Sequence, residues 1–124
     1  MLNQTGKAAL LLAALAATNA LGQTTVAGDI VVPAGDTLIL SDDTTYTGSL
    51  TIEAGAEVVV NAGTQIDFAD GATLTVNGTE SDPVLLFPIS GSWDGLLFQT
   101  GSTGTIAGAV LTDFRDVAIE IEDA

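Results

Sequence analysis

Residues 52–75 read IEAGAEVV (52–59), VNAGTQID (60–67) and FADGATLT (68–75), three octads without a gap. Each octad has apolar residues at its first and seventh positions and a glycine at its fourth. An α-helix would lose about 1 kcal/mol at every such glycine, and the neighbouring Val and Ile residues add to that penalty. The repeat therefore indicates a short strand, a glycine corner and another short strand.

Three such sides make one coil of three octads, and the sequence repeats at that distance, because LTI at 50–52 returns as LTV at 74–76. In stacked coils, each strand forms hydrogen bonds with the equivalent strands of the coils above and below, and similar side chains line up in ladders. We therefore predict an all-β chain, a right-handed parallel β-helix whose N-terminal coils these are. The side chains expected to point inward are Ile52, Val58, Val60, Ile66, Phe68, Leu74 and Val76.

The octad pattern is less regular on either side of this stretch. An earlier copy, VPAGDTLI (32–39), lies four residues out of phase, so we expect the intervening SDDTTYTG (41–48) to form a protruding turn. In the second half we expect apolar runs to lie about one coil apart. These runs are 84–87 with 109–111, and 96–98 with 117–119.

Residues 1–22 have the pattern of a secretory signal peptide. Lys7 precedes an apolar run from Ala8 to Ala17, and small residues follow. We expect cleavage before Gln23, with cleavage after Ala20 as the alternative. The apolar run is too short to span a bilayer comfortably, so we expect a secreted or surface-located domain of residues 23–124 with no permanent membrane anchor in this segment.

The charge of the chain is one-sided. All 16 carboxylates lie beyond the leader, where Arg115 is the single cation. Nucleic acid is excluded as a partner, because phosphate binding needs clustered Lys and Arg. We expect a solvated acidic surface that keeps the protein soluble. The sharper alternative is calcium binding between stacked coils, and no cofactor is expected otherwise. The carboxylates considered for calcium are Asp42, Asp43, Asp67 and Asp70.

Few residues are available for catalysis. The chain contains no His and no Cys, which removes nucleophilic triads and His or thiolate metal sites. The one charged cluster that could act on a polysaccharide is Asp113, Arg115 and Asp116, although an exposed turn in which the Arg pairs with nearby carboxylates explains it as well. We therefore lean against enzymatic activity for this segment.

Two further patterns bear on ligand binding. Trp93 is either a sugar-stacking platform or a ring that covers a corner beside Gly95, and the sequence favours the second. Threonines are frequent, but ice-binding solenoids need hydroxyl rows in every coil, and only Thr51 and Thr75 repeat at the spacing of three octads.

Residues 74–87 (LTVNGTESDPVLLF) and 90–98 (SGSWDGLLF) form a recognisable pattern of Gly-Thr, Pro, a buried strand and Trp-x-Gly. It resembles secreted bacterial right-handed β-helix repeat proteins, and SLTIEAGAEV (49–58) is similar to the coil that precedes the pattern in them. The resemblance spans roughly 29–124. It implies export and this fold, with surface-associated or carbohydrate-related roles.

Members of that group usually run for many coils, whereas this chain stops after VAIEIED (117–123) with no capping segment, which we interpret as a fragment or a truncated product. The open last coil predicts self-association. Two classes of function stay open: a structural or adhesive surface module without catalysis, and a polysaccharide-binding or polysaccharide-degrading protein. Polysaccharide and other surface proteins are the expected partners.

Overall fold

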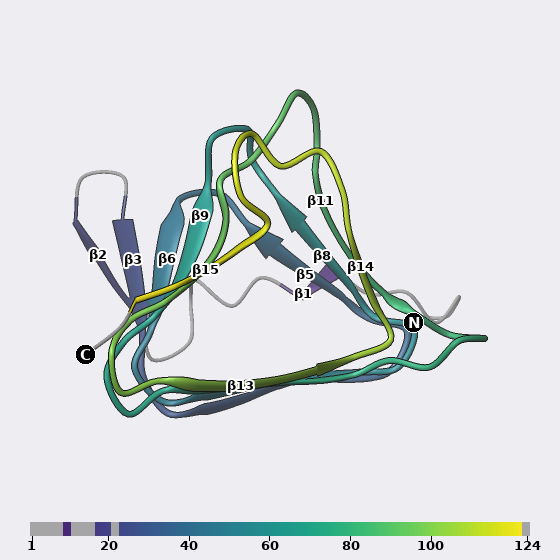
Figure 1. Cartoon of the computed structure of the whole chain (residues 1–124), viewed down its shortest axis with the longest axis horizontal. Coiled ribbons are helices and arrows are strands. Elements are labelled where there is room, and N and C mark those ends of the chain that lie inside the picture. Colours follow the sequence, from purple (N-terminus) through teal and green to yellow (C-terminus); the bar gives the residue numbers. More distant parts are fainter. Residues whose placement is uncertain (1–8, 11–16, 21–22, 123–124) are drawn as a thin grey trace.

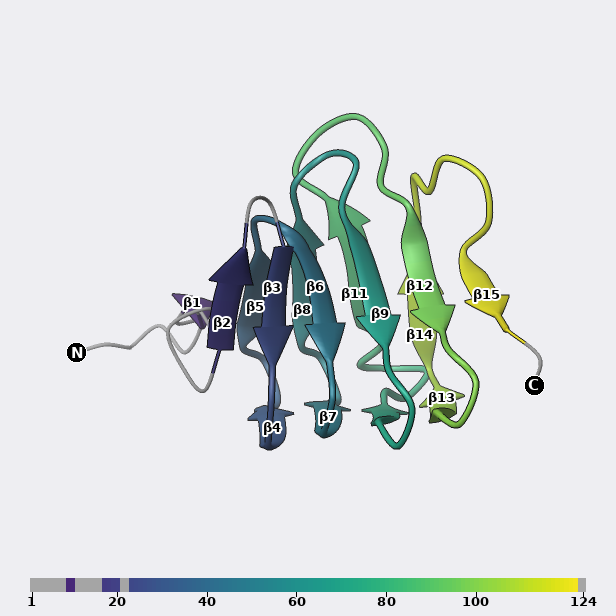
Figure 2. The same cartoon turned by 90° about the vertical axis from the view of Figure 1, so that its left-hand side faces the viewer.

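The computed structural model describes residues 9–10, 17–20 and 23–122, and these form strands and turns without a helix. The chain winds around three sheets that enclose a triangular cross-section (Figure 1). Successive coils lie one behind another along the axis of the triangle, as the side view in Figure 2 shows. The protein is thus a parallel β-solenoid, which confirms the predicted fold class.

Each sheet collects one side of every coil. Sheet A contains β1 (Ala9–Leu10), β5 (Thr37–Leu40), β8 (Glu57–Val60), β11 (Val84–Pro88) and β14 (Ala109–Leu111). Sheet B contains β2 (Ala17–Ala20), β3 (Gln23–Val26), β6 (Asp43–Tyr46), β9 (Gln65–Phe68), β12 (Gly95–Phe98) and β15 (Ile119–Ile121). Sheet C contains β4 (Asp29–Val32), β7 (Ser49–Glu53), β10 (Thr73–Asn77) and β13 (Thr103–Ala107).

The predicted coil of three octads is present where the octads are. Leu50 pairs with Leu74, and Ile52 with Val76, in the parallel register of β7 and β10. Other coils differ in length. The coil that joins Asp29 to its partner Ser49 is shorter, and the coil that joins Thr73 to Thr103 is longer. The strands keep their register because the additional residues lie in the corners between them.

This variation corrects three sequence predictions. The segment 41–48 is not a protruding turn, because it contains strand β6, whose Thr44 and Tyr46 are buried. The first coils are shorter than three octads, and the shorter coil brings the octad at Val32 into register with Ile52. In the last coil, Leu96 pairs with Ile119, so the strand is 119–121 rather than 117–119.

The core is a continuous stack of inward side chains. All seven residues predicted to point inward are at most 1% exposed. Within sheet B, Tyr46, Phe68 and Phe98 occupy one inward column, because Tyr46 pairs with Phe68 and Phe68 with Phe98. Their rings stack at centroid distances of 5.7 and 4.9 Å. Aligned ladders of this kind bury apolar surface and stabilise the stack by about 25 cal/mol per Å² buried.

Glycine forms the corners as predicted. Gly55 and Gly63 turn the chain between β7 and β8 and between β8 and β9, with φ values of 78° and 80°. Only glycine adopts such angles without strain. The longer coils gain their residues in the loops 78–83 and 89–94, which flank β11.

The two ends of the described stack differ. β13, β14 and β15 are each the last strand of their sheet, so each carries one unpaired edge among the described residues. At the other end, β2 pairs antiparallel with β3, and β1 pairs parallel with β5. Most of the predicted leader lies outside the described residues, and cleavage before Gln23 would fall between β2 and β3.

Candidate functional site

The three outer faces of the solenoid carry different chemistry. Along the strands of the inner coils, such as β7, β8 and β9, buried residues alternate with half-buried ones, so every second side chain faces outward. The outward residues of sheet A are mostly apolar, those of sheet B are mostly acidic or amide, and those of sheet C are mostly hydroxyl-bearing. A single coil therefore presents three surfaces that face away from one another, as the triangular outline in Figure 1 implies.

A polar hollow lies on the outside of sheet B, next to the corner that precedes β15. It is a pocket of about 290 Å³. Its walls come from β9, from the corner before β12 and from the segment that leads to β15. The lining residues are Gln65, Asp94, Arg115, Asp116, Val117 and Glu120.

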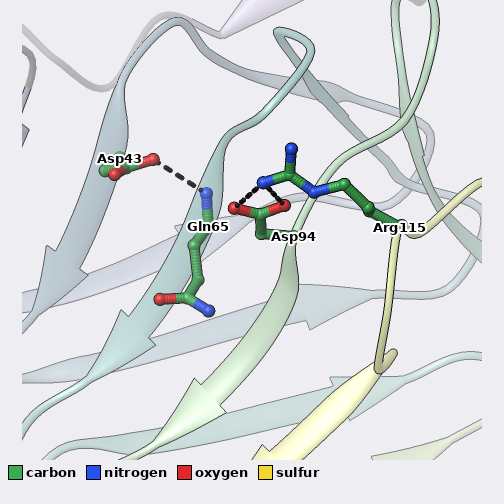
Figure 3. A network of polar contacts seen from close by, with 4 residues as sticks. All are labelled: Asp43, Gln65, Asp94 and Arg115. Carbon is green, nitrogen blue, oxygen red and sulfur yellow. Dashed lines mark hydrogen bonds and ion pairs between the residues drawn. The ribbon is translucent and has the colours of Figure 1, made fainter.

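An ion pair closes one side of this pocket (Figure 3). Arg115 Nη2 lies 2.7 Å from Asp94 Oδ1 and donates a hydrogen bond to Oδ2 at 3.0 Å. Beside it, the backbone N–H of Gln65 donates to Asp43 Oδ1 at 3.0 Å. The Arg115 side chain is 64% exposed, so solvent screens the pair and it contributes at most about 1 kcal/mol to stability.

Trp93 positions the corner that carries Arg115. The indole Nε1–H donates to Thr112 O at 2.7 Å. The Trp93 N–H donates to Asp113 O at 3.0 Å, and Trp93 O accepts from the Arg115 N–H at 2.7 Å. Trp93 is fully buried, so neither face of its ring is available to a sugar. The corner-covering role fits this geometry, and the sugar-stacking role does not.

The predicted cluster of Asp113, Arg115 and Asp116 is only partly assembled. Arg115 and Asp116 both line the pocket, but Arg115 forms its ion pair with Asp94, which sequence reasoning missed. Asp113 lies outside the pocket lining and adopts a left-handed φ of 58°, as a turn residue does. The sequence signal for Asp94 was present, since it is the middle residue of the Trp-x-Gly motif.

Asp67 lies on β9 with its neighbours Thr45 on β6 and Leu97 on β12. Burial raises its pKa to about 6, and the nearby charges of Asp43 and Glu122 contribute to the rise. Its Oδ1 is buried without a hydrogen-bond partner in the described protein. A carboxyl with a pKa near 6 can exchange protons at neutral pH, but Asp67 is not among the residues that line the pocket.

The four calcium candidates are spread over two parts of the solenoid. Asp42 precedes β6, and Asp43 is the first residue of that strand. Asp67 lies within β9, and Asp70 lies in the corner after β9, next to Gly101. Of these, Asp43 acts electrostatically on Asp67. Among the residues that the structure describes, no group of three or more acidic, His or Cys side chains has a metal-binding arrangement.

Sheet A carries a second surface that the sequence reasoning did not single out. The strands β5, β8, β11 and β14 read TLIL, EVVV, VLLFP and AVL, so most outward positions are apolar as well as the inward ones. Thr37 and Glu57 are the polar outward residues of this face. Ile39, Val59 and Phe87 form one outward column, and Leu85 stands above Val110 in the next. The signal was the near-continuous apolar run, which is typical of strands covered on both faces.

Comparison with protein-family models, with curated proteins and with solved structures finds no match to this chain. What is established is therefore the class, a parallel β-solenoid with one acidic, one apolar and one hydroxyl-bearing outer face. In the described part of the chain, no helix is long and apolar enough to cross a membrane.

Proposed function

We propose that this chain is an exported structural or adhesive module of a surface-located β-solenoid and has no catalytic activity of its own. The observation that carries the proposal is the apolar outer face of sheet A. A strand face that contacts only water is normally polar, whereas Ile39, Val59 and Phe87 stand in one outward column there. The free energy of the system falls when another surface covers such an apolar face.

The size of this gain supports an adhesive role. Full burial of an exposed large apolar side chain contributes about 1.5 to 3 kcal/mol, and the half-buried Ile39, Val59 and Phe87 would each contribute part of that amount. The neighbouring Val110 and Ile89 are 44% and 62% exposed. A partner with a complementary apolar strip, such as another surface protein, would therefore bind along several coils at once.

The last coil provides a second contact surface. Ile119 and Ile121 are 37% and 71% exposed, and with Phe98 and Ile106 they line an apolar hollow of about 260 Å³. In sheet B the aromatic column ends at Phe98, over which Ile121 stands. Further coils, or a second copy of the chain, would complete these ladders and pair the open strand edges. The proposal therefore includes self-association through the exposed Ile119 and Ile121 side chains.

Export is tested by the intact mass of the protein recovered outside the producing cell. A mature chain that begins at Gln23 or Leu21 supports the proposed localisation. A chain that still begins at Met1 contradicts it.

The adhesive role is tested by sedimentation and by adsorption of the exported chain to apolar beads. Phe87→Ser on sheet A should weaken adsorption, and Thr51→Ser on sheet C is the matched control. Ile121→Ser should instead lower self-association while adsorption is kept. A monomeric exported chain that adsorbs no better than Phe87→Ser would contradict the proposal.

The pocket beside Asp94 and Arg115 supports one alternative, a polysaccharide-binding or polysaccharide-degrading protein. Amide, guanidinium and carboxylate groups are the donors and acceptors that recognise sugar hydroxyls. Incubation with acidic and neutral polysaccharides, followed by assays for reducing ends and unsaturated uronates, tests it. Product formation that disappears in Arg115→Gln and Asp94→Asn would replace our proposal by this alternative.

A further inference from the structure

The outer face of sheet C carries two straight columns of hydroxyl groups. Ser49, Thr73 and Thr103 are register partners in the first column. Thr51, Thr75 and Thr105 are register partners in the second. Each of the strands β7, β10 and β13 therefore presents two hydroxyl residues at equivalent positions, Ser and Thr on β7 and two Thr on β10 and β13, separated by one residue.

Sequence spacing conceals these columns. The coil from Thr75 to Thr105 is longer than the coil from Thr51 to Thr75, so Thr103 and Thr105 lie outside the period of three octads. In the sheet, however, Thr103 pairs with Thr73 and Thr105 pairs with Thr75, so the hydroxyl residues are aligned. The hydroxyl rows that sequence spacing did not reveal are thus present in three successive coils.

The array is flat and regular. Strands of one sheet are about 4.8 Å apart, and residues two positions apart on a strand are separated by about 6.7 Å. The strands of sheet C lie behind one another along the base of the triangle in Figure 1. Threonine is β-branched and has few χ1 states, so the hydroxyl and methyl groups of the five threonines of the array occupy few positions. Thr73 Oγ1 and Thr103 Oγ1 lie 3.1 Å apart, which holds two hydroxyls of one column in line.

The array is also uncharged, in a chain with 16 carboxylates. Acidic groups occur only at its margins: Asp29 Oδ1 accepts from the Ser49 hydroxyl at 2.8 Å, and Glu53 Oε1 accepts from Asn77 at 3.5 Å. No aromatic residue stands among the outward positions of these three strands. A charged polymer has no counter-charge here, and a sugar ring has no ring on which to stack.

We propose that the hydroxyl array of sheet C binds an ordered water lattice, the surface of an ice crystal. Hydroxyls on a rigid grid hold water molecules at repeated positions, and the methyl groups between them confine the remaining water. Immobilising a water molecule costs little when it makes good hydrogen bonds. Six hydroxyl side chains on a preorganised flat grid can bind several water molecules at once, each with good hydrogen bonds. A flexible or charged surface does not hold water molecules at such regular positions.

The test uses the full exported chain in an ice-growth assay, with crystal shape, thermal hysteresis and recrystallisation as readouts. Thr75 stands at the centre of the array, and Thr75→Lys places a long charged side chain on it. We expect this variant to need about tenfold more protein for the same inhibition of recrystallisation. Thr45→Lys is the matched control, because Thr45 faces outward from the central strand β6 of sheet B. The control should act as the original chain does.

Thermal melting checks that Thr75→Lys is folded, and Thr105→Lys at the exposed end of the array is a second variant if it is not. Ice that grows unchanged with the original chain would overturn the proposal, as would equal effects of Thr75→Lys and Thr45→Lys. Binding to crystalline cellulose that Thr75→Lys abolishes, without any effect on ice, would also overturn it and assign the array to a neutral polysaccharide. Because sheet A is untouched by these variants, failure here leaves the adhesive role intact.

Discussion

Tyr46 stacks on Phe68 with ring centroids 5.7 Å apart and ring planes inclined by 18°. The pair lies inside the solenoid, where burial raises the pKa of the Tyr46 hydroxyl well above its usual value. That hydroxyl has no hydrogen-bond partner in the described protein. The ring therefore contributes to the aromatic column, while its polar group is buried at a cost.

We expect Tyr46→Phe to stabilise the protein. Removing an unpaired buried hydroxyl relieves a desolvation penalty of about 1 kcal/mol or more, and the ring stacking is kept. Thermal and chemical denaturation should show a higher midpoint. Tyr46→Leu, which removes the ring as well, should lower it, and a lower midpoint for Tyr46→Phe would show that the hydroxyl is satisfied in solution.

Two adjacent residues of β10 should respond in opposite ways to the same substitution. Leu74→Asp places an unpaired charge in the core and should cost about 3 kcal/mol or more, because the Leu74 side chain is 1% exposed. Thr75→Asp changes an outward side chain and should cost less than about 1 kcal/mol. Urea denaturation compares the two. An equal loss of unfolding free energy in both variants would contradict the conclusion that Leu74 points inward and Thr75 outward.

Asp67 should make stability depend on pH. Its folded pKa of about 6 lies above the ordinary value of 3.8, so the folded state binds this proton more tightly than the unfolded state does. The resulting contribution is fully present below about pH 3.8 and is lost as the pH rises through 6. Asp67→Asn should therefore be more stable than the original chain at pH 7, and the difference should shrink toward pH 4.

Melting curves from pH 4 to pH 8 measure this difference. Asp82→Asn removes the same charge from an exposed corner and serves as the control for a general reduction in repulsion. If both variants are stabilised equally at pH 7, the buried position of Asp67 is not the cause of the higher stability.

Salt should raise stability as well. Sixteen carboxylates face two cations in the whole chain, and their mutual repulsion weakens the compact state. Sodium chloride at high concentration screens these charges. Melts in low salt, high sodium chloride and millimolar calcium separate screening from specific binding. A calcium effect beyond that of ionic strength, lost in Asp43→Asn, would support the predicted calcium site, and identical melts in all three would contradict both effects.

The octads allowed the coil to be predicted because three of them have equal length. Leu50 lies over Leu74 as the repeat of three octads requires. Tyr46 lies in strand β6 and not in the predicted turn, because the coils differ in length and the prediction used one length for all of them. Backbone register tolerates corners of different length, and a sequence read without register cannot show which threonines align.

The candidate site was predictable only in part, for a similar reason. Arg115 and Asp116 are close in sequence and were found together, whereas Asp94 reaches Arg115 from the previous coil. Contacts between coils depend on how many residues each corner holds. The pKa of Asp67 likewise depends on burial and on Asp43 and Glu122 from neighbouring coils, which no local pattern reveals.

The unequal corners have a practical consequence for engineering. The loop 78–83 lies outside the ladders, and Glu80 and Ser81 at its tip are exposed. Closing a loop of doubled length costs only about 0.6 kcal/mol more. A foreign peptide spliced between these two residues should leave β10 and β11 in register, so the solenoid can serve as a rigid scaffold for display of an epitope.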